Sequence, residues 1–333
     1  MMSADGATIR MTTQDEESAQ VSNVWRICQS ANFSGPEVRS NSVMRVRPRL
    51  AAACLLSLAV TLSAQSTLPR PEQIADGVQL YRLHDPALLD PPGPIAVQAL
   101  RLDPRRVTLE IGRGQDADPR ETVETIAERQ PGAIAAVNAG FFSLETGRPT
   151  DYLRIDGEVV SGTSRPRGAV AILDRNGVTR LLFDRVTVNP RGSGPPAYET
   201  LLGSSPREWA RAQDAVSGAG LLMRDGRVLT DWTDERIAAG FETTRHPRTL
   251  IGTGENGSIW LITVDGRNPL LSFGMSFAEL QRLAKRLGLR SALNLDGGGS
   301  TTMWVEGKIV NHPSDPEGPR KVSEAILVVP RGQ

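Results

Sequence analysis

Apolar and polar residues alternate along most of the chain after residue 77, and this period of two predicts β-strands. Four pairs of alternating runs flank an Asp-Gly or Asn-Gly dipeptide, the strongest short-range signal for a β-hairpin. The four dipeptides are Asp156-Gly157, Asn176-Gly177, Asp225-Gly226 and Asn256-Gly257. Further strands are expected at residues 77–83, 95–102, 107–111, 133–137, 303–306, 308–311 and 325–329.

Two segments have helical spacing instead. Residues 121–129 form one, with Asp118 expected as the N-cap and Pro119 as the first helical residue. The other begins with a capping box, Ser276 and Glu279, followed by leucines on one helical face. Many strands, few helices and no regular βαβ alternation predict an α+β fold. We expect a single domain with a large mixed, mostly antiparallel β-sheet core and a few packed helices.

The N-terminal part of the chain contains the pattern of a secretory signal peptide. A basic stretch that starts at Met44 precedes the apolar run 50–62 and then small residues, so residues 44–65 are interpreted as the signal peptide. The apolar run is shorter than the about 20 residues of a membrane span. We therefore expect a periplasmic or secreted protein with no stable membrane span after signal cleavage.

The segments on either side of the predicted signal peptide differ from it in composition. Residues 1–43 are polar and poorly periodic, and are interpreted as a disordered or non-native upstream extension of the reading frame. The alternative is a cytoplasmic tail before a signal anchor. Residues 66–94 are rich in proline and form a lead-in to the main domain, which is expected at residues 95–330.

Charge and cysteine content exclude some classes of function. Lys and Arg number 38, as do Asp and Glu, so the chain lacks the basic excess typical of nucleic-acid binding. Both cysteines, Cys28 and Cys54, precede the predicted cleavage point. The mature protein would therefore have no disulfide framework, no cysteine zinc site and no catalytic thiol.

The segment from Asn294 to Thr302 has the most unusual composition in the chain. Three consecutive glycines, Gly297, Gly298 and Gly299, follow Asp296, and Ser300 and Thr301 come next. Glycine costs backbone entropy, so this run indicates positive φ angles or the approach of another group to bare backbone. Successive N–H groups in such a turn can bind an anion. The alternative is a tight turn in which Asp296 caps the loop.

Three other segments place polar residues at the ends of predicted strands. They are Asn138 to Phe142, Arg245 to Thr249, and Val264 to Arg267. Polar groups at strand ends are a common way for a rigid sheet to present a functional site.

Together these segments resemble the phosphodiester glycosidase family. The matching residues are 138–142, Arg248-Thr249 with Ile251-Gly252, 264–267, 293–302 and Pro313-Ser314-Asp315, and the resemblance covers about residues 95–330. The chain departs from the family pattern at Ala139, at Glu324-Ala325 and at residues 149–152. The resemblance implies a hydrolase that cleaves the glycosidic bond of a sugar-1-phosphodiester, so the expected partner is a carbohydrate or sugar-phosphodiester substrate.

The resemblance also implies roles for the residues of these segments. Arg248 and Arg267 would hold the phosphate, although each could instead form a structural ion pair. Asp296, with Asp265 as the second candidate, would stabilise or attack the anomeric centre, or activate water. Groups that would fix sugar and phosphate oxygens are Asn138, Asn294, the N–H groups of Gly297, Gly298 and Gly299, the hydroxyls of Ser300 and Thr301, and His246. Asn138 could alternatively cap its strand, and Asp265 could be a turn residue.

A phosphate leaving group is already weakly basic, so one carboxylate could suffice without a strong general acid. No cofactor is expected to be required. Scattered histidines such as His84 and His312 and the lack of mature cysteines argue against zinc. A Ca²⁺ ion held by Asp296, Asp265 or Asp315 with backbone carbonyls stays open. Two other classes also stay open: a metal-dependent phosphodiesterase and a non-catalytic envelope glycan-binding module. The sequence leaves the sugar and the oligomeric state undetermined.

Overall fold

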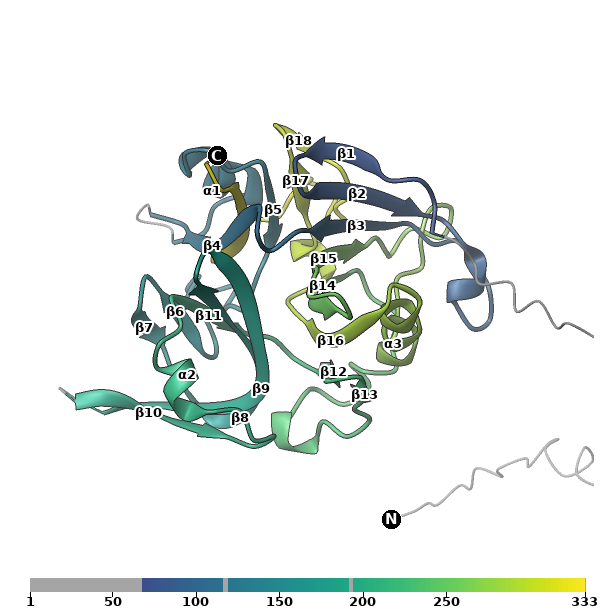
Figure 1. Cartoon of the computed structure of the whole chain (residues 1–333). Helices are drawn as coiled ribbons and strands as arrows, with labels where there is room; N and C mark the ends of the chain where they lie inside the picture. The colour runs from purple at the N-terminus through teal and green to yellow at the C-terminus, as the bar shows by residue number, and fades with distance from the viewer. Residues whose placement is uncertain (1–67, 116–118, 192–193, 333) are drawn as a thin grey trace, which may run out of the picture. The chain divides into compact units, whose positions relative to one another are not determined.

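The computed structural model of the protein describes residues 68–115, 119–191 and 194–332 (Figure 1). The predicted upstream extension and signal peptide, and the predicted N-cap Asp118, lie outside the described residues. The described strands form three sheets of eight, six and five strands. Within each sheet, all neighbouring strands are antiparallel. The predicted α+β fold with a mostly antiparallel β core is therefore confirmed.

The eight-stranded sheet has the order β1-β2-β3-β15-β14-β16-β12-β13. Its strands are β1 (Glu72–Ala75), β2 (Val78–Leu83), β3 (Val97–Leu102), β15 (Ile259–Val264), β14 (Arg248–Gly254), β16 (Leu289–Asn294), β12 (Leu221–Arg224) and β13 (Arg227–Val228). The proline-rich segment before residue 95 thus contributes two strands at one edge of the largest sheet.

The other two sheets are built from the remaining strands. The six-stranded sheet contains β10 (Gly194–Thr200), β9 (Val178–Arg191), β8 (Thr163–Arg175), β11 (Asp214–Ser217), β6 (Leu153–Ile155) and β7 (Glu158–Ser161), in that order. The five-stranded sheet contains β18 (Lys308–Ile309), β17 (Met303–Val305), β5 (Ala135–Asn138), β19 (Glu324–Pro330) and β4 (Val107–Arg113).

The four predicted hairpins all form, as β6–β7, β8–β9, β12–β13 and β14–β15. At three of the turns both central residues have positive φ, for example 51° at Asp156 and 80° at Gly157. This conformation matches the twist of the flanking strands, which explains the Asp-Gly and Asn-Gly sequences. The β8–β9 hairpin is longer than predicted, and strands β1, β10 and β11 were not predicted.

The main hydrophobic core lies between the sheets. One apolar cluster contains Leu100 of the eight-stranded sheet, Val170 of the six-stranded sheet and Ile326 of the five-stranded sheet, all fully buried. A side chain of this size stabilises the fold by about 1.5–3 kcal/mol when it is removed from water. The three sheets therefore share one core and form a single folding unit.

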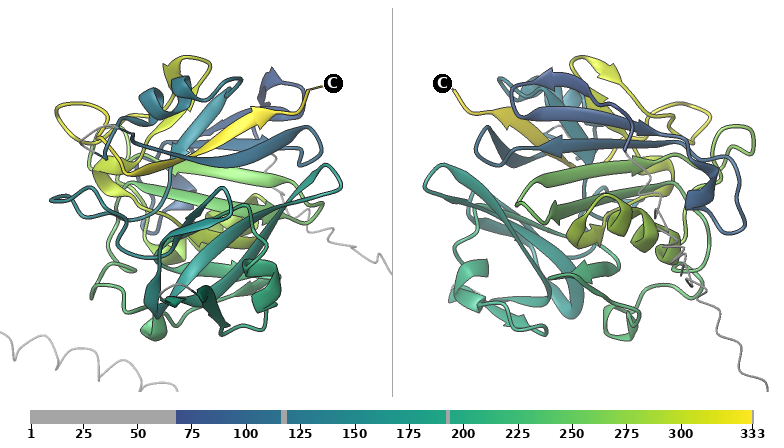
Figure 2. Two further views of the ribbon diagram at one scale, coloured as in Figure 1. Left: turned by 90° about the vertical axis from the view of Figure 1, so that its left-hand side faces the viewer. Right: turned by 45° about the vertical axis from the view of Figure 1, so that its right-hand side comes forward.

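Helices cover the outer faces of the sheets. They are α1 (Val123–Arg129), α2 (Pro206–Trp209) and α3 (Phe277–Arg286). Leu280 and Leu283 of α3 pack on Leu250 and Ile262 of the eight-stranded sheet, and α3 is seen against this sheet in Figure 2. The predicted capping box of α3 is confirmed. No helix among the described residues is long and apolar enough to cross a membrane.

Helix α1 starts later than the sequence predicts. Its N-cap is Thr122, whose hydroxyl accepts a hydrogen bond of 3.2 Å from the Thr125 N–H. Thr122 therefore satisfies the free N–H group at the helix start, and Pro119 lies outside the helix.

The eight-stranded and five-stranded sheets approach one another at one edge. Arg248 at the start of β14 pairs with Val264 at the end of β15, and β16 ends beside them at Asn294. The chain beyond β16 then crosses to the five-stranded sheet, where the Asp296 N–H donates to the Ala139 carbonyl at 2.9 Å. This edge collects the polar segments that the sequence singled out.

Candidate active site

Asp296 lies on the loop between β16 and β17, and its backbone is held on both sides. Besides the bond to Ala139, its carbonyl accepts a hydrogen bond of 2.7 Å from the Asn138 Nδ2. Its Oδ1 accepts the Gly297 N–H at 2.8 Å. The fold thus anchors the backbone of Asp296 on both sides, and the next residue of the loop binds one of its carboxylate oxygens.

Burial raises the pKa of Asp296 to about 6. The neighbouring Ser300 hydroxyl, the Gly297 N–H and the charge of Arg320 oppose this shift, because each favours the ionised carboxylate. The group is therefore ionised at neutral pH and becomes protonated within an accessible acidic range.

Asn138 and Asn294 are fully buried and form the frame beneath the loop. The Asn138 Oδ1 accepts bonds from the Thr249 hydroxyl at 2.6 Å and from the Thr302 N–H at 3.2 Å. The Asn294 Nδ2 donates to the carbonyls of Ala219 and Leu295 at 2.8 and 2.9 Å. These bonds favour the strand-end interpretation of Asn138, because its amide positions the Asp296 loop.

The glycine run permits close packing. A Cβ atom at Gly297 would lie 2.5 Å from the Pro247 carbonyl oxygen, and one at Gly299 would lie 2.2 Å from both oxygens of Asp315. Gly298 has a φ of 60°, and a Cβ there would lie 2.9 Å from the Arg267 Nη2. Any side chain would displace the groups that surround the loop.

Two of the three glycine N–H groups that were expected to fix substrate oxygens already have partners within the protein. The Gly297 N–H binds the Asp296 carboxylate, and the Gly298 N–H donates to the Pro247 carbonyl at 2.9 Å. These bonds keep the two N–H groups occupied within the protein. Ser300 and Thr301 are buried at the end of this loop, and the Thr301 hydroxyl has no hydrogen-bond partner among the described residues.

Arg248 has the surroundings of a structural residue. Its guanidinium donates to the carbonyls of Met275, Phe241 and Thr244 at 2.7–2.9 Å. It lies between two aromatic rings, 4.5 Å from the centre of Phe241 and 5.0 Å from that of Phe277. Burial lowers the pKa of Arg248 to about 10, so the group stays protonated at neutral pH. Its Nη1 is buried without a hydrogen-bond partner among the described residues.

Arg267 is the more accessible of the two predicted arginines. Its side chain is 47 % exposed and lies over Gly298, with Nη1 3.4 Å from the Ser314 hydroxyl and 3.9 Å from Asp315. Arg320, which the sequence analysis did not identify, binds the same Asp315 carboxylate at 2.7 Å. Two guanidinium groups therefore lie against the glycine loop, and Asp315 is placed between them.

His246 lies in the segment before β14, with its ring stacked on Phe241 at a centroid distance of 6.0 Å. Burial lowers the pKa of His246, and the charges of Arg248 and Arg267 lower it further. The imidazole is therefore neutral at neutral pH, and it lies in a region of positive potential. Such a region favours the binding of an anion.

Asp265 is buried, and the protein itself surrounds its carboxylate with donors. Gln98 and Asn311 donate at 3.3 and 3.1 Å, and the His312 N–H donates at 2.9 Å. The His312 Nδ1 lies 3.4 Å from the other oxygen. Asp265 thus positions the segment that contains Asn311 and His312. His312, to which the sequence gave no role, is therefore held in place by Asp265.

Glu324 is a further carboxyl group at this edge, at a position where the sequence departs from the family pattern. It is 1 % exposed at the start of β19, and its carbonyl accepts a hydrogen bond of 3.1 Å from the Ala139 N–H. Burial raises the pKa of Glu324 to about 7, and the charge of Asp296 adds to this shift. Only the folded structure brings these two carboxyl groups together.

The acidic residues that the structure describes do not gather into a metal-binding cluster. Among the residues that the structure describes, no three His, Cys, Asp or Glu side chains come together to hold an ion. Asp265 is surrounded by amide and imidazole donors, and Asp315 is paired with arginines.

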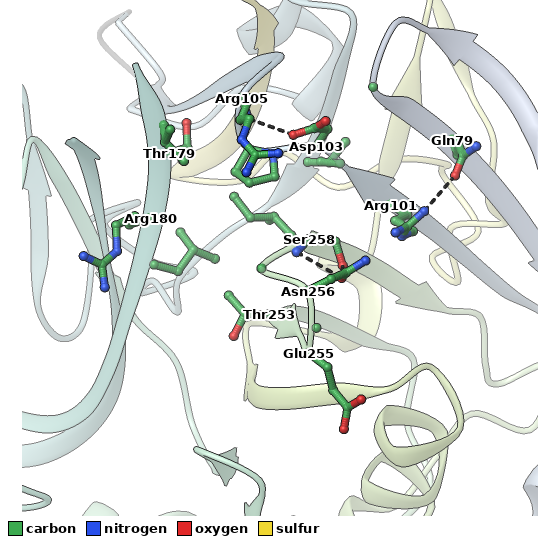
Figure 3. A pocket seen from close by; sticks show the side chains of 18 of the residues that line it. Gln79, Arg101, Asp103, Arg105, Thr179, Arg180, Thr253, Glu255, Asn256 and Ser258 are labelled. Carbon is green, nitrogen blue, oxygen red and sulfur yellow. Dashed lines mark hydrogen bonds between the residues drawn. The ribbon is translucent and has the colours of Figure 1, made fainter. Parts of the chain in front are cut away.

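A cavity of about 880 Å³ lies at the opposite ends of β14 and β15 (Figure 3). Arg101, Arg105 and Arg180 are among the residues that line it, together with the 253–258 turn. None of the site residues predicted from the sequence lines this cavity. The cavity is therefore separate from the edge that holds Asp296.

A model of the phosphodiester glycosidase family matches residues 131–329, more than half of the 333-residue chain. Mouse N-acetylglucosamine-1-phosphodiester alpha-N-acetylglucosaminidase is 27 % identical in an alignment of 226 residues that covers 63 % of this chain and 40 % of the mouse protein. The chain thus spans about two fifths of the length of this relative.

Two solved structures share the fold. A protein from Synechocystis aligns over 79 % of this chain and 64 % of its own with a TM-score of 0.64 and 20 % identity. The zebrafish N-acetylglucosamine-1-phosphodiester alpha-N-acetylglucosaminidase catalytic domain, auto-inhibited by its pro-peptide, aligns over 80 % and 87 % with a TM-score of 0.60 and 20 % identity. The region matched by the family model includes Asn138, Asp296 and Glu324. The chain belongs to the phosphodiester glycosidase family.

Proposed function

We propose that this protein hydrolyses the glycosidic bond of a sugar-1-phosphodiester. One observation carries the proposal: Asp296, whose backbone is anchored by Asn138, lies on the glycine loop, and two guanidinium groups lie against the same loop. Such a site combines a negative group for a developing cation with positive groups for a phosphate. Family membership and the activity in the name of the mouse relative support the same reaction.

Arg267 is proposed to bind the phosphate directly. Its guanidinium is half exposed, so it can turn toward a ligand and hold two oxygens with its planar fork. Arg320 adds positive charge next to Gly299 of the same loop. Arg248 is assigned an indirect role, since its bonds to three carbonyls fix the segment that carries His246.

Asp296 is proposed to act at the anomeric carbon, where positive charge develops as the bond to phosphate breaks. Water supplies the hydroxyl group that ends on the sugar, and its proton ends on the released phosphomonoester. A phosphate leaving group needs little protonation, so a single ionised carboxylate suffices. His246, neutral at neutral pH, is proposed to donate a hydrogen bond to a phosphate oxygen.

Export through the segment 44–65 is also part of the proposal. It would bring the enzyme to phosphodiester-linked sugars of the cell envelope. The mechanism uses no cofactor, and a calcium requirement would appear as loss of turnover in EDTA.

The test is hydrolysis of a panel of sugar-1-(methyl phosphate) diesters by the wild-type chain and by Asp296→Asn, with EDTA or with added calcium. We expect reducing sugar from the wild type and a loss of about 10²–10⁴-fold in the variant. Equal turnover by both proteins would contradict the role of Asp296. A folded wild type that binds these diesters without cleaving any would identify a glycan-binding module instead.

A further inference from the structure

The cavity of Figure 3 lies far from the edge that holds Asp296. Strand β14 runs from Arg248 at that edge to Gly254 at the cavity, and a strand of 7 residues is about 20 Å long. The eight-stranded sheet lines the cavity with the 253–258 turn, and the six-stranded sheet lines it with residues 178–181 of β9. Its volume of about 880 Å³ is in the range of small-molecule binding sites.

Hydrogen bonds hold the walls of this cavity together. The Thr179 N–H of β9 donates to the Pro104 carbonyl at 2.9 Å, and the Thr179 hydroxyl donates to the Val107 carbonyl at 2.7 Å. The turn before Val107 is closed by Asp103, whose Oδ1 accepts the Arg105 N–H at 2.9 Å. The cavity is therefore formed before any ligand arrives, which lowers the cost of binding.

Three arginines that line the cavity keep their charge available. They are Arg101, Arg105 and Arg180, and among the described residues none of them forms an ion pair with a carboxylate. Arg101 donates instead to the neutral Gln79 Oε1 at 3.3 Å. Guanidinium groups bind carboxylate and phosphate oxygens with two parallel hydrogen bonds. The lining therefore favours an anionic ligand.

The acidic residues of the lining do not neutralise these arginines. Asp76 binds Arg106, which does not line the cavity, at 3.3 Å. Asp103 accepts the backbone N–H of the turn, and Figure 3 shows the Glu255 side chain directed away from Arg105. Positive charge is therefore left for a ligand.

The other polar side chains of the cavity are neutral amides and hydroxyls. They are Gln73, Gln79, Thr179, Thr253, Asn256 and Ser258. The Asn256 Oδ1 accepts the Ser258 hydroxyl at 2.9 Å, which orients the amide and leaves its NH₂ group to donate to a ligand. A hollow of about 370 Å³ also has Arg101 and Asn256 in its lining and extends this polar surface. Groups that both donate and accept suit a ligand with many hydroxyl groups.

We propose that this cavity is a second binding site, separate from the candidate active site, and that it takes an acidic oligosaccharide. The arginines bind the carboxylates of the sugar units, and the amides and hydroxyls bind their hydroxyl groups. The proposal concerns binding alone and does not rest on the proposed hydrolysis.

The test is calorimetric titration of the full chain with tetragalacturonate. We expect the double variant Arg105→Ala/Arg180→Ala to bind at least about tenfold more weakly, because charge-assisted hydrogen bonds are lost. Both side chains are exposed, so the variant should fold. Arg207→Ala, which removes an exposed arginine of α2 outside the cavity, is the matched control and should bind as the wild type does.

Two further variants separate this site from the candidate active site. Asn256→Ala should weaken binding of tetragalacturonate by about fivefold, because a hydrogen-bond donor in the cavity is lost. Asp296→Asn should bind it as tightly as the wild type. A protein that cleaves no sugar phosphodiester would thus remove the proposed function and leave the binding result intact.

Neutral maltotetraose and inorganic phosphate test the class of ligand. Both should bind at least about tenfold more weakly than tetragalacturonate, because each offers only part of its contacts. No binding of tetragalacturonate to the wild type, or equal binding to the wild type and the double variant, would overturn the proposal. Equal affinity for maltotetraose would contradict the role of the arginines, and equal affinity for phosphate would contradict recognition of a sugar.

Discussion

A carboxylate that stabilises a cation must be ionised although the protein shields it from water. For Asp296 burial raises the pKa to about 6, while the Gly297 N–H and Arg320 limit the shift. The protonated form lacks the charge that the reaction needs. Activity is therefore expected to be lost as the pH falls below this value.

We predict that kcat rises about tenfold per pH unit below pH 6 and levels off above it. Initial rates between pH 4.5 and 7.5 with one cleaved diester measure this. The residual rate of Asp296→Asn should lack the rising limb. A wild-type rate that stays constant over the range would contradict ionisation of Asp296 as the controlling step.

Arg267 is expected to contribute to substrate binding. Its replacement in Arg267→Ala should raise KM by about tenfold, equivalent to about 1.4 kcal/mol, because a charge-assisted bond to the phosphate is lost. Arg282→Ala is a matched control, since its side chain is 44 % exposed against 47 % for Arg267 and lies on α3. An increase in KM of the same size in both variants would indicate a general charge effect.

The loop of Gly297, Gly298 and Gly299 is the element around which the residues of the candidate active site gather. Its glycines have close neighbours, and Gly299 is the most constrained, because a Cβ atom there would lie 2.2 Å from Asp315 and 2.2 Å from Arg320. The loop thus needs small residues for packing, which a sequence pattern alone cannot distinguish from a need for free N–H groups.

We predict that Gly299→Ala destabilises the protein by about 1–3 kcal/mol and strongly lowers turnover, because the added methyl group displaces Asp315 and Arg320. Thermal unfolding and kcat measure the two effects. Gly332→Ala is the control, since a Cβ atom there meets nothing within 4 Å. A Gly299→Ala protein with wild-type stability would show that the loop can move away at little cost.

At the scale of the whole molecule, Glu324 links the site to stability. Its raised pKa means that the folded state holds a proton that the unfolded chain releases at the ordinary value of 4.5. The stability from the protonated group is fully present below pH 4.5 and is lost as the pH rises through about 7.

We predict that Glu324→Gln becomes more stable relative to the wild type between pH 4.5 and pH 8, by on the order of 2 kcal/mol. Chemical denaturation at the two pH values measures the free energy of unfolding. The exposed Glu199 supplies the control variant Glu199→Gln, whose difference from the wild type should not depend on pH in this way. A constant difference for Glu324→Gln would contradict burial of its charge.

Much of the fold could be predicted because it depends on local patterns. The hairpin turns require positive φ at Asp156 and Gly157, and the start of α3 requires a capping box, so their residues are informative. Helix α1 was placed too early because Pro119 and Thr122 are both suitable near a helix start, and only the Thr122 hydrogen bond decides between them.

The site could be predicted only in part. The four polar segments do meet at one sheet edge, as expected from strand ends. The contacts of Arg248 with Phe241 and Phe277, and the closeness of Glu324 to Asp296, depend on long-range packing. No spacing in the sequence encodes them, which is why Arg248 appeared as a phosphate ligand and Glu324 as a departure from the pattern.

The most direct test of the proposed function is hydrolysis of a sugar-1-(methyl phosphate) in water enriched in ¹⁸O, followed by mass spectrometry of both products. Attack at the anomeric carbon predicts ¹⁸O in the released sugar and none in the methyl phosphate. Label in the methyl phosphate would show cleavage of the P–O bond and would contradict the role assigned to Asp296.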